Sequence, residues 1–299
     1  TVTMYHVFPG VSVLYSDFHM PFCESGFQTE YDMLCIDHCK EGRMEQEMGN
    51  GAYTYLEAGD LKIDRRIHHK GHIEFPTHHF HGVTIAFDMK EATKNLPLEM
   101  RDFPVDLYAL QKKYCDSKHP FVIPGEPAIE HIFSELYSIP LNIKKYYLKV
   151  KIFELLLYLD ALELAGTKEE RPYFYKTQVE KIKAIRSLMT ENLTEHYTLD
   201  DLAKRFDIPH TTMKSCFKSI YGNSIFAYMR EYRMNYAANL LREQNDLSIA
   251  QIAGMVGYDS PGKFSSAFKA VMGSTPLSYR KFPVHAVNLW PGGEDETSK

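Results

Sequence analysis

Two stretches of the chain decide its fold: residues 198–222, TLDDLAKRFDIPHTTMKSCFKSIYG, and residues 248–273, SIAQIAGMVGYDSPGKFSSAFKAVMG. Each stretch begins with apolar residues at positions i, i+3, i+4 and i+7, which is the spacing of one helix face. The second set follows the first by fifty residues: Leu199, Leu202, Ala203 and Phe206, then Ile249, Ile252, Ala253 and Val256. The match predicts a duplicated helical unit.

A second helix follows a short turn in each stretch. Its apolar positions also repeat, 51 residues apart: Met213, Cys216, Phe217 and Ile220, then Phe264, Ala267, Phe268 and Val271. Both second helices are expected to end at a glycine, Gly222 and Gly273, because glycine adopts the left-handed conformation found after a helix. Thr198 with Asp201, and Ser248 with Gln251, have the spacing of a capping box. Two short helices joined by a tight turn form a helix-turn-helix, so the sequence predicts two of them.

The charge of the chain is unevenly distributed. Residues 173–283 contain 15 Lys and Arg against 10 Asp and Glu, residues 1–172 contain 18 against 26, and the whole chain has a net charge of −5. A basic segment in an acidic chain indicates an anionic partner. Because the duplicated motif lies in this segment, we expect it to bind double-stranded DNA; an all-helical core without a ligand is the alternative.

Residues 224–242 are predicted to form one helix between the two motifs. These nineteen residues, at about 1.5 Å each, would span ~28 Å. That length is close to the ~34 Å that separates successive major-groove faces on one side of DNA. A rigid helix of this length would place the two second helices one turn of DNA apart.

The basic half resembles the AraC/XylS family of transcription regulators over about residues 177–281. The resemblance rests on both motifs, on YMREYRM at 228–234 leading into AANLL at 237–241, and on GSTPLSYR at 273–280, which is similar to the family signature. The family fold implies seven helices, two of which read adjacent major grooves.

The resemblance also implies which side chains face DNA. The base-facing positions of the family fall on Thr211, Lys214, Ser215, Gly262, Lys263, Ser265 and Ser266. Lys218 and Lys269 match positions that face phosphate. Ser215 and Ser266 stand where the family often has arginine, so the bidentate guanine contact of arginine is missing there.

The first ~125 residues contain short alternating apolar runs separated by Gly and Pro, which predicts strands. The candidate strands are Val11 to Tyr15, Met33 to Cys39, Arg43 to Met48, Tyr53 to Leu56, Asp60 to Ile63 and Val83 to Phe87. Many short strands favour an antiparallel sandwich or barrel. The family resemblance implies a cupin-like barrel that binds an effector and dimerises, and residues 30–165 loosely resemble the siderophore-responsive subgroup. The effector-binding residues stay unassigned.

From Ala128 the apolar period becomes helical. A heptad-like seam is formed by Leu148, Ile152, Leu155, Leu159 and Leu162. Other apolar residues lie around the same helix, so we expect it to be covered on two sides, by the barrel and by a second subunit. A helix sandwiched within its own monomer is the alternative.

Histidine is concentrated in residues 68–81, at His68, His69, His72, His78, His79 and His81. The i, i+2 spacing of His79 and His81 puts both on one strand face, as in a cupin metal site. However, the first carboxylate after them is Asp88. A second candidate fails because Cys35 and Cys39 on a strand would face away from His38. We therefore expect no metal and no cofactor.

The expected architecture is α+β with two domains. A cupin-like antiparallel β-barrel (1–125) and a helical dimerisation segment with a linker (126–172) precede an all-α double helix-turn-helix (173–283) and a disordered tail (284–299). The sequence shows no catalytic pattern, so we do not expect an enzyme.

The expected function is a DNA-binding transcription regulator controlled by a small-molecule effector, acting as a cytoplasmic homodimer, with RNA polymerase as a further partner. We expect no secretory signal, because no basic, then apolar, then small-residue pattern opens the sequence. The odd number of five Cys favours reduced thiols. The longest apolar run, Leu155 to Leu159, is far short of the ~20 residues that span a membrane. The alternatives are a cupin metalloenzyme with a DNA-binding appendage and an effector-independent DNA-binding regulator.

Overall fold

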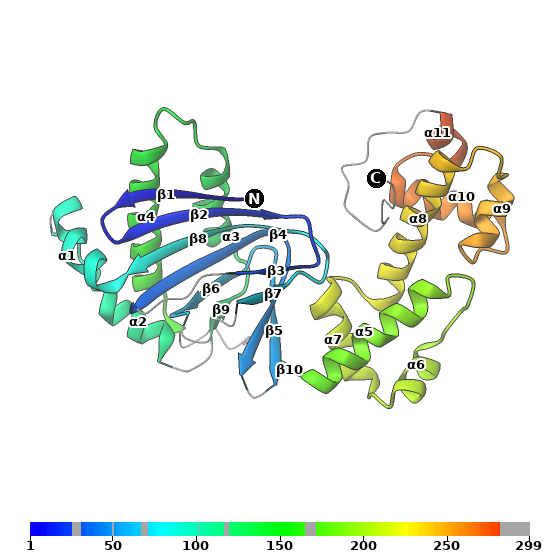
Figure 1. The fold of residues 1–299 in the computed structure, drawn as a ribbon, viewed down its shortest axis with the longest axis horizontal. Helices are drawn as coiled ribbons and strands as arrows, with labels where there is room; N and C mark the ends of the chain where they lie inside the picture. The colour runs from blue at the N-terminus through cyan, green and yellow to red at the C-terminus, as the bar shows by residue number, and fades with distance from the viewer. Residues whose placement is uncertain are drawn as a thin grey trace, which may run out of the picture. The chain divides into compact units, whose positions relative to one another are not determined.

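The structure, a computed structural model, describes residues 1–25, 31–49, 51–66, 71–100, 102–116, 120–164 and 172–281. The chain divides into two compact units, with the boundary between Tyr173 and Phe174 (Figure 1). Within these described ranges, no helix is both long enough and apolar enough to cross a membrane. His68, His69 and the predicted tail at 284–299 lie outside the described residues.

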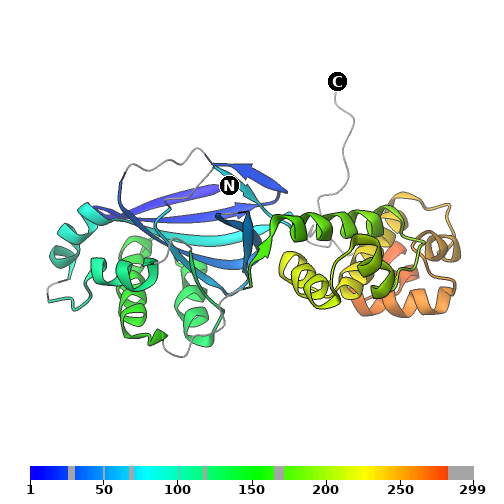
Figure 2. The ribbon, with the colours of Figure 1, turned by 90° about the horizontal axis from the view of Figure 1, so that it is seen from below.

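The first unit is an antiparallel sheet whose one face carries helices (Figure 2). Its strands are β1 (Val2–Phe8), β2 (Val11–Phe18), β3 (Phe22–Glu24), β4 (Met33–Gly49), β5 (Ala52–Glu57), β6 (Leu61–Asp64), β7 (His72–Glu74), β8 (Phe80–Asp88) and β9 (Phe121–Ile123). Its helices are α1 (Met89–Glu99), α2 (Leu107–Cys115), α3 (Pro127–Ser134), the 3-10 helix η1 (Glu135–Ser138) and α4 (Lys144–Ala161).

The sheet is built around β4. Its strands follow the order β1-β2-β8-β4-β5, β6 pairs with both β4 and β9, and β3 pairs with β7 in a separate two-stranded sheet. Among the described residues this path does not close into a ring, so the cupin-like barrel stays a prediction. The coarser expectation, a strand-rich unit followed by a helical one, is confirmed.

Alternate residues of the central strands face opposite sides of the sheet. On β8, Val83, Ile85 and Phe87 are buried in the main core with the helices, whereas Phe80, Thr84 and Ala86 line a cavity. The sheet therefore separates a helix-covered core from a face that can hold a ligand.

β4 is one long strand where the sequence predicts two. Its ladder with β8 is irregular between Cys39 and Glu41, and Gly42 has φ +84°. A Cβ at Gly42 would lie 1.9 Å from the carbonyl oxygen of His79. Glycine therefore bends the strand here without ending it, because only glycine combines this φ with so close a backbone contact.

The expectation of strands up to residue 125 is wrong for α1 and α2. Asp88 and Asp106 cap these helices, each accepting hydrogen bonds from two backbone N–H groups in the first turn. Carboxylates at this position stabilise a helix N-terminus.

The predicted subunit seam is also wrong, because its side chains lie in the core of their own unit. Leu148 and Ile152 are each 1% exposed, and Leu155 and Leu159 are fully buried. Leu162, at the end of α4, is partly buried against the same core. Side chains that are already covered within the monomer cannot form a contact with a second subunit.

The second unit is helical. After the short β10 (Phe174–Tyr175) its helices are α5 (Lys176–Glu191), α6 (Leu199–Phe206), α7 (His210–Tyr221), α8 (Ile225–Glu243), α9 (Ile249–Met255), α10 (Pro261–Met272) and α11 (Pro276–Lys281). The C-terminal half of α8 shares one core with α9, α10 and Tyr279 of α11. The described part of this unit thus contains the seven helices that the family resemblance implied.

Candidate nucleic-acid interface and ligand cavity

The first helix-turn-helix consists of α6 and α7. The hydroxyl of Thr198 accepts a hydrogen bond from the backbone N–H of Asp201, whose carboxylate accepts one from the N–H of Thr198. This reciprocal pair is the predicted capping box. The turn begins at Asp207, which has φ +46°, and α7 ends at Gly222 with φ +86°.

The second helix-turn-helix consists of α9 and α10. Ser248 and Gln251 form the equivalent capping box, and α10 ends at Gly273 with φ +75°. At the turn, Gly257 has φ +79°, and a Cβ there would lie 2.4 Å from the carbonyl oxygen of Leu193. Asp207 adopts a left-handed conformation at the matching place of the first copy, so the duplication extends to the backbone of the turn.

The inner faces of α7 and α10 are held by apolar packing. Met213, Cys216, Phe217 and Ile220 of α7 are fully buried, as are Phe264 and Phe268 of α10. The predicted apolar stripes are therefore real, except that Ala267 and Val271 are only partly buried. Burial of one face fixes which face of each helix remains free.

The free faces carry the residues predicted to contact DNA. The exposed ones are Thr211, Lys214, Ser215 and Lys218 on α7, and Gly262, Lys263, Ser266 and Lys269 on α10; Ser265 is half-buried. Within residues 172–281, none of these four lysines forms an ion pair with a carboxylate. Unpaired ammonium groups on one side of a helix can neutralise phosphates.

Several arginines of the basic half donate hydrogen bonds to groups within the second unit. A count of charges in the sequence cannot separate them from the exposed lysines. The Arg186 side chain donates a hydrogen bond to the Tyr228 hydroxyl over 3.0 Å. Arg233 donates to the carbonyl of Glu195, and Arg280 to that of Leu247. Contacts over 30 or more residues in sequence cannot be read from local patterns. The positive charge available to a nucleic acid is therefore smaller than the composition suggests.

α8 connects the two motifs as a single helix of 19 residues. Ser224 caps its N-terminus by accepting a hydrogen bond from the backbone N–H of Ala227. At about 1.5 Å per residue the helix is ~28 Å long. The unbroken helix agrees with the length predicted from the sequence.

The first unit contains a cavity of about 330 Å³ on the face of the sheet opposite the helices. Its walls are mainly apolar and include Leu14, Phe18, Met44, Phe75 and Phe80. The described lining contains no tyrosine. A volume of this size suits a small organic ligand.

A buried charge network forms the polar end of this cavity. Asp37 binds Lys62, with Oδ2 and Nζ 3.1 Å apart, and Arg66, with Oδ1 and Nη2 2.5 Å apart. The hydroxyl of Thr84 donates a hydrogen bond to the same carboxylate over 2.6 Å. Burial alone would raise the pKa of Asp37, but the charges of Arg66 and Lys62 lower it to about 2. The carboxylate is therefore ionised in the folded state.

The predicted histidine and cysteine candidates separate on the sheet. His81 lies edge-on to Tyr137, with ring centroids 5.1 Å apart, whereas Nδ1 of His79 lies 3.3 Å from Nδ1 of His19. His38 stacks on Phe133 among the helices, and Cys35 lines the cavity on the other face. The opposite orientations of residues 35 and 38 are as predicted.

Comparison with known proteins agrees with this geometry. Residues 202–281 match the family model described as a helix-turn-helix domain. An AraC-like transcription regulator of Streptomyces lividans is 39% identical over 87 residues, 29% of this chain and 28% of that protein. The transcriptional activator RhaR of Mannheimia succiniciproducens is 26% identical over 146 residues, 49% of this chain and 51% of that protein.

Among solved structures, the DNA-binding domain of AdpA in complex with a target DNA is similar at 27% identity and a TM-score of 0.32, over 34% of this chain and 90% of that one. The matching part of the chain spans about half or less of the length of the two curated relatives named above. Its second unit belongs to the class of helix-turn-helix domains. More narrowly, this unit is similar to AraC-like transcription regulators, which confirms the predicted family resemblance over this part of the chain.

Proposed function

We propose that this protein is a sequence-specific DNA-binding transcription regulator whose first unit binds a small-molecule effector. The observation that carries the proposal is the duplicated helix-turn-helix in which both second helices keep a polar, partly basic face exposed. A purely structural helical core would have no need for the same free face in both copies. RNA polymerase is the further partner expected for such a regulator.

In this proposal α7 and α10 each enter a major groove. Lys214 and Lys263 reach base edges, while Lys218 and Lys269, near the C-terminal ends of their helices, neutralise phosphates. Serine and threonine hydroxyls complete the base contacts at Thr211, Ser215, Ser265 and Ser266. Contacts to bases carry sequence information, and contacts to phosphates carry affinity and salt dependence.

The cavity supports an effector-controlled regulator over an effector-independent one. A cavity of about 330 Å³ lined mainly by apolar side chains leaves that apolar surface in contact with water, which costs free energy. A domain with only a structural role gains nothing from such a space. A small molecule that fills it would cover that surface and so stabilise the folded state.

The lining also favours a class of effector. Leu14, Phe18 and Phe80 offer apolar surface, and the charges at the polar end balance, since Asp37 and Asp64 are both paired with Lys62 and Arg66. A ligand with its own net charge would leave one charge buried without a partner. We therefore propose an apolar or aromatic molecule with a neutral hydrogen-bonding group, which Thr84 and Asp37 can contact.

We also propose that the protein is a homodimer through the outer face of α4, in place of the seam that proved to be core. Tyr146 is 72% exposed, Val150 62% and Leu157 42%. These residues recur at steps of four and seven, so they form one apolar stripe opposite the buried one. The helix would then be covered on two sides, as the sequence predicted. The face predicted to contact the second subunit packs in the core, and the opposite face contacts the second subunit.

DNA binding is tested with the full chain and a pool of random duplexes. Repeated selection should enrich a sequence that binds at least a thousandfold more tightly than scrambled DNA at physiological salt. Replacing both Lys214 and Lys263 by Ala should abolish that preference, whereas Lys90→Ala, on an exposed lysine of α1, should leave it unchanged. Failure to enrich any sequence would contradict the proposal.

The effector is tested by thermal unfolding in the presence of a metabolite library. A ligand at 100 times its dissociation constant should stabilise the protein by ~2.7 kcal/mol. Ala86→Leu places a larger side chain in the cavity lining and should remove the shift, whereas Ala128→Leu, on the exposed side of α3, should keep it. A shift that survives Ala86→Leu would place the ligand elsewhere.

A further inference from the structure

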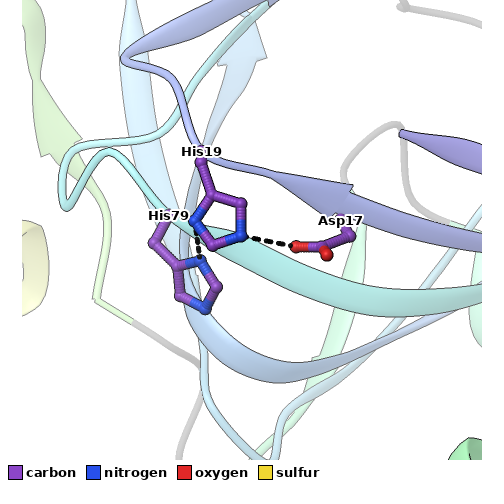
Figure 3. Close-up of side chains that lie close together, drawn as sticks. All are labelled: Asp17, His19 and His79. Carbon is purple, nitrogen blue, oxygen red and sulfur yellow. Dashed lines mark hydrogen bonds and ion pairs between the residues drawn. The ribbon is translucent and has the colours of Figure 1, made fainter. Parts of the chain in front are cut away.

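Two histidines meet at the end of the β2–β8 ladder. The ladder is antiparallel and its last described pair joins Phe18 with Phe80, so His19 and His79 are the next pair in register. Their rings lie 4.7 Å apart, centroid to centroid, and the two Nδ1 atoms are separated by 3.3 Å (Figure 3). The two imidazoles thus converge on one point through equivalent nitrogen atoms.

The opposite nitrogen of each ring faces a carboxylate. Nε2 of His19 lies 3.1 Å from Oδ1 of Asp17, and Nε2 of His79 lies 3.4 Å from Oε2 of Glu41. These four residues come from three neighbouring segments, β2 with the residue after it, β4, and the residue before β8. A carboxylate therefore lies near the nitrogen that faces away from the partner ring in both histidines, although Nε2 of His79 makes no hydrogen bond in the described structure.

We propose that His19 and His79 bind a divalent transition-metal ion of the zinc type through their Nδ1 atoms. At a Zn–N distance of about 2.0–2.1 Å and tetrahedral angles, two ligand nitrogens lie about 3.3 Å apart. The observed Nδ1 separation of 3.3 Å matches this distance.

The carboxylates match the second requirement of such a site. A metal-bound histidine usually donates its other N–H to a carboxylate, which fixes the ring and the tautomer. Asp17 lies at this position beside His19, and Glu41 lies 3.4 Å from Nε2 of His79, close enough for a small side-chain movement to complete the hydrogen bond. One oxygen of the Asp17 carboxylate and one nitrogen of each histidine lie within 4.8 Å of one another, so Asp17 would become a direct ligand only if its carboxylate left Nε2 of His19. His19 and Asp17 are exposed, so water completes the coordination.

The proposed ion would link two strands at the rim of the cavity. His19 follows Phe18 and His79 precedes Phe80, and both phenylalanines line the cavity. A cross-link at this position would hold the end of the β2–β8 ladder closed. The site differs from the pair His79 and His81 suggested by sequence spacing, because His81 lies against Tyr137.

The test uses the full chain without a histidine tag, titrated with ZnCl₂ by calorimetry and with CoCl₂ by visible absorption. One Zn²⁺ should bind per chain, and Co²⁺ should give a ligand-field band. Both His19→Ala and His79→Ala should weaken Zn²⁺ binding at least tenfold. The matched control is His6→Ala, which removes an exposed histidine whose Nδ1 lies 3.0 Å from the Ser12 hydroxyl, and it should bind like the wild type.

Thermal unfolding separates the proposal from a folding defect. Zn²⁺ should raise the melting temperature of the wild type and of the His6 variant but not of the other two, while all four proteins melt alike in chelator. No binding to the wild type, or binding that neither His19→Ala nor His79→Ala weakens, would overturn the proposal. Equal weakening by His6→Ala would overturn it too.

Discussion

Lys263 and Lys269 are both exposed on α10, one in its first turn and one near its C-terminal end. If Lys263 contacts a base, Lys263→Ala should cost ~1–3 kcal/mol on the specific site and relax preference within it. If Lys269 contacts phosphate, Lys269→Ala should weaken all sequences alike and reduce the salt slope by about 1. Salt titrations on specific and scrambled duplexes measure both effects, and identical behaviour of the two variants would contradict these roles.

The buried imidazole of His38 should make the stability of the first unit depend on pH. It is 1% exposed, its Nδ1 lies 3.0 Å from the Tyr137 hydroxyl, and burial lowers its pKa from 6.5 to about 4. Between these values the unfolded chain binds the proton and the folded chain does not. The free energy of unfolding should therefore fall as pH drops from 6.5 to 4, by at most about 3 kcal/mol from this group.

Urea unfolding at several pH values between 7 and 4 measures this dependence. His38→Gln keeps a polar partner for Tyr137 but cannot take up a proton, so its stability should depend less steeply on pH than that of the wild type. His6→Ala, which removes an exposed histidine, should keep the wild-type slope. A His38→Gln variant with an unchanged slope would show that His38 is not the group responsible.

Replacing two glycines of the second helix-turn-helix by alanine should change the stability of the unit in opposite directions. Gly257→Ala combines φ +79° with a Cβ 2.4 Å from the Leu193 carbonyl oxygen, whereas a Cβ at Gly254 meets no atom within 4 Å. Gly257→Ala should destabilise the unit by at least 1–2 kcal/mol, since L residues disfavour this conformation. Gly254→Ala, inside α9, should stabilise it by about 0.5–1 kcal/mol. Equal effects in chemical denaturation would contradict the described turn.

The two faces of α4 are expected to respond differently to a charge. Replacing both Val150 and Leu157 by Glu should convert a dimer into a folded monomer, because both side chains are exposed in the single chain. Leu155→Glu should instead unfold the first unit, because Leu155 is fully buried and a charge there has no partner. Sedimentation velocity and circular dichroism distinguish these outcomes. An unchanged dimer in the double variant would exclude this face.

For the whole molecule, the sequence predicted best where structure depends on local spacing. The helix-turn-helix units follow from apolar periodicity, caps and terminal glycines such as Gly222 and Gly273, all of which act within one or two helical turns. The orientation of α4 could not be predicted, because two apolar stripes on one helix do not reveal which neighbour covers which stripe.

The candidate sites also differ in whether they depend on residues close together or far apart in the sequence. The exposed faces of α7 and α10 were predictable as the positions opposite a local apolar stripe. The cavity and the His19–His79 pair were not, since they join residues that are far apart in sequence. His19 and His79 are separated by 60 positions and meet only because β2 and β8 pair in one register.

The central claim is that one chain reads DNA through two helix-turn-helix units held apart by α8. Hydroxyl-radical footprinting of the full chain on a selected duplex tests it most directly. The claim predicts two protected segments per chain, centred ~10 base pairs apart on one side of the duplex. Lys214→Ala should weaken protection mainly in one segment and Lys263→Ala mainly in the other. A single protected segment per chain, or equal loss in both segments from either variant, would contradict it.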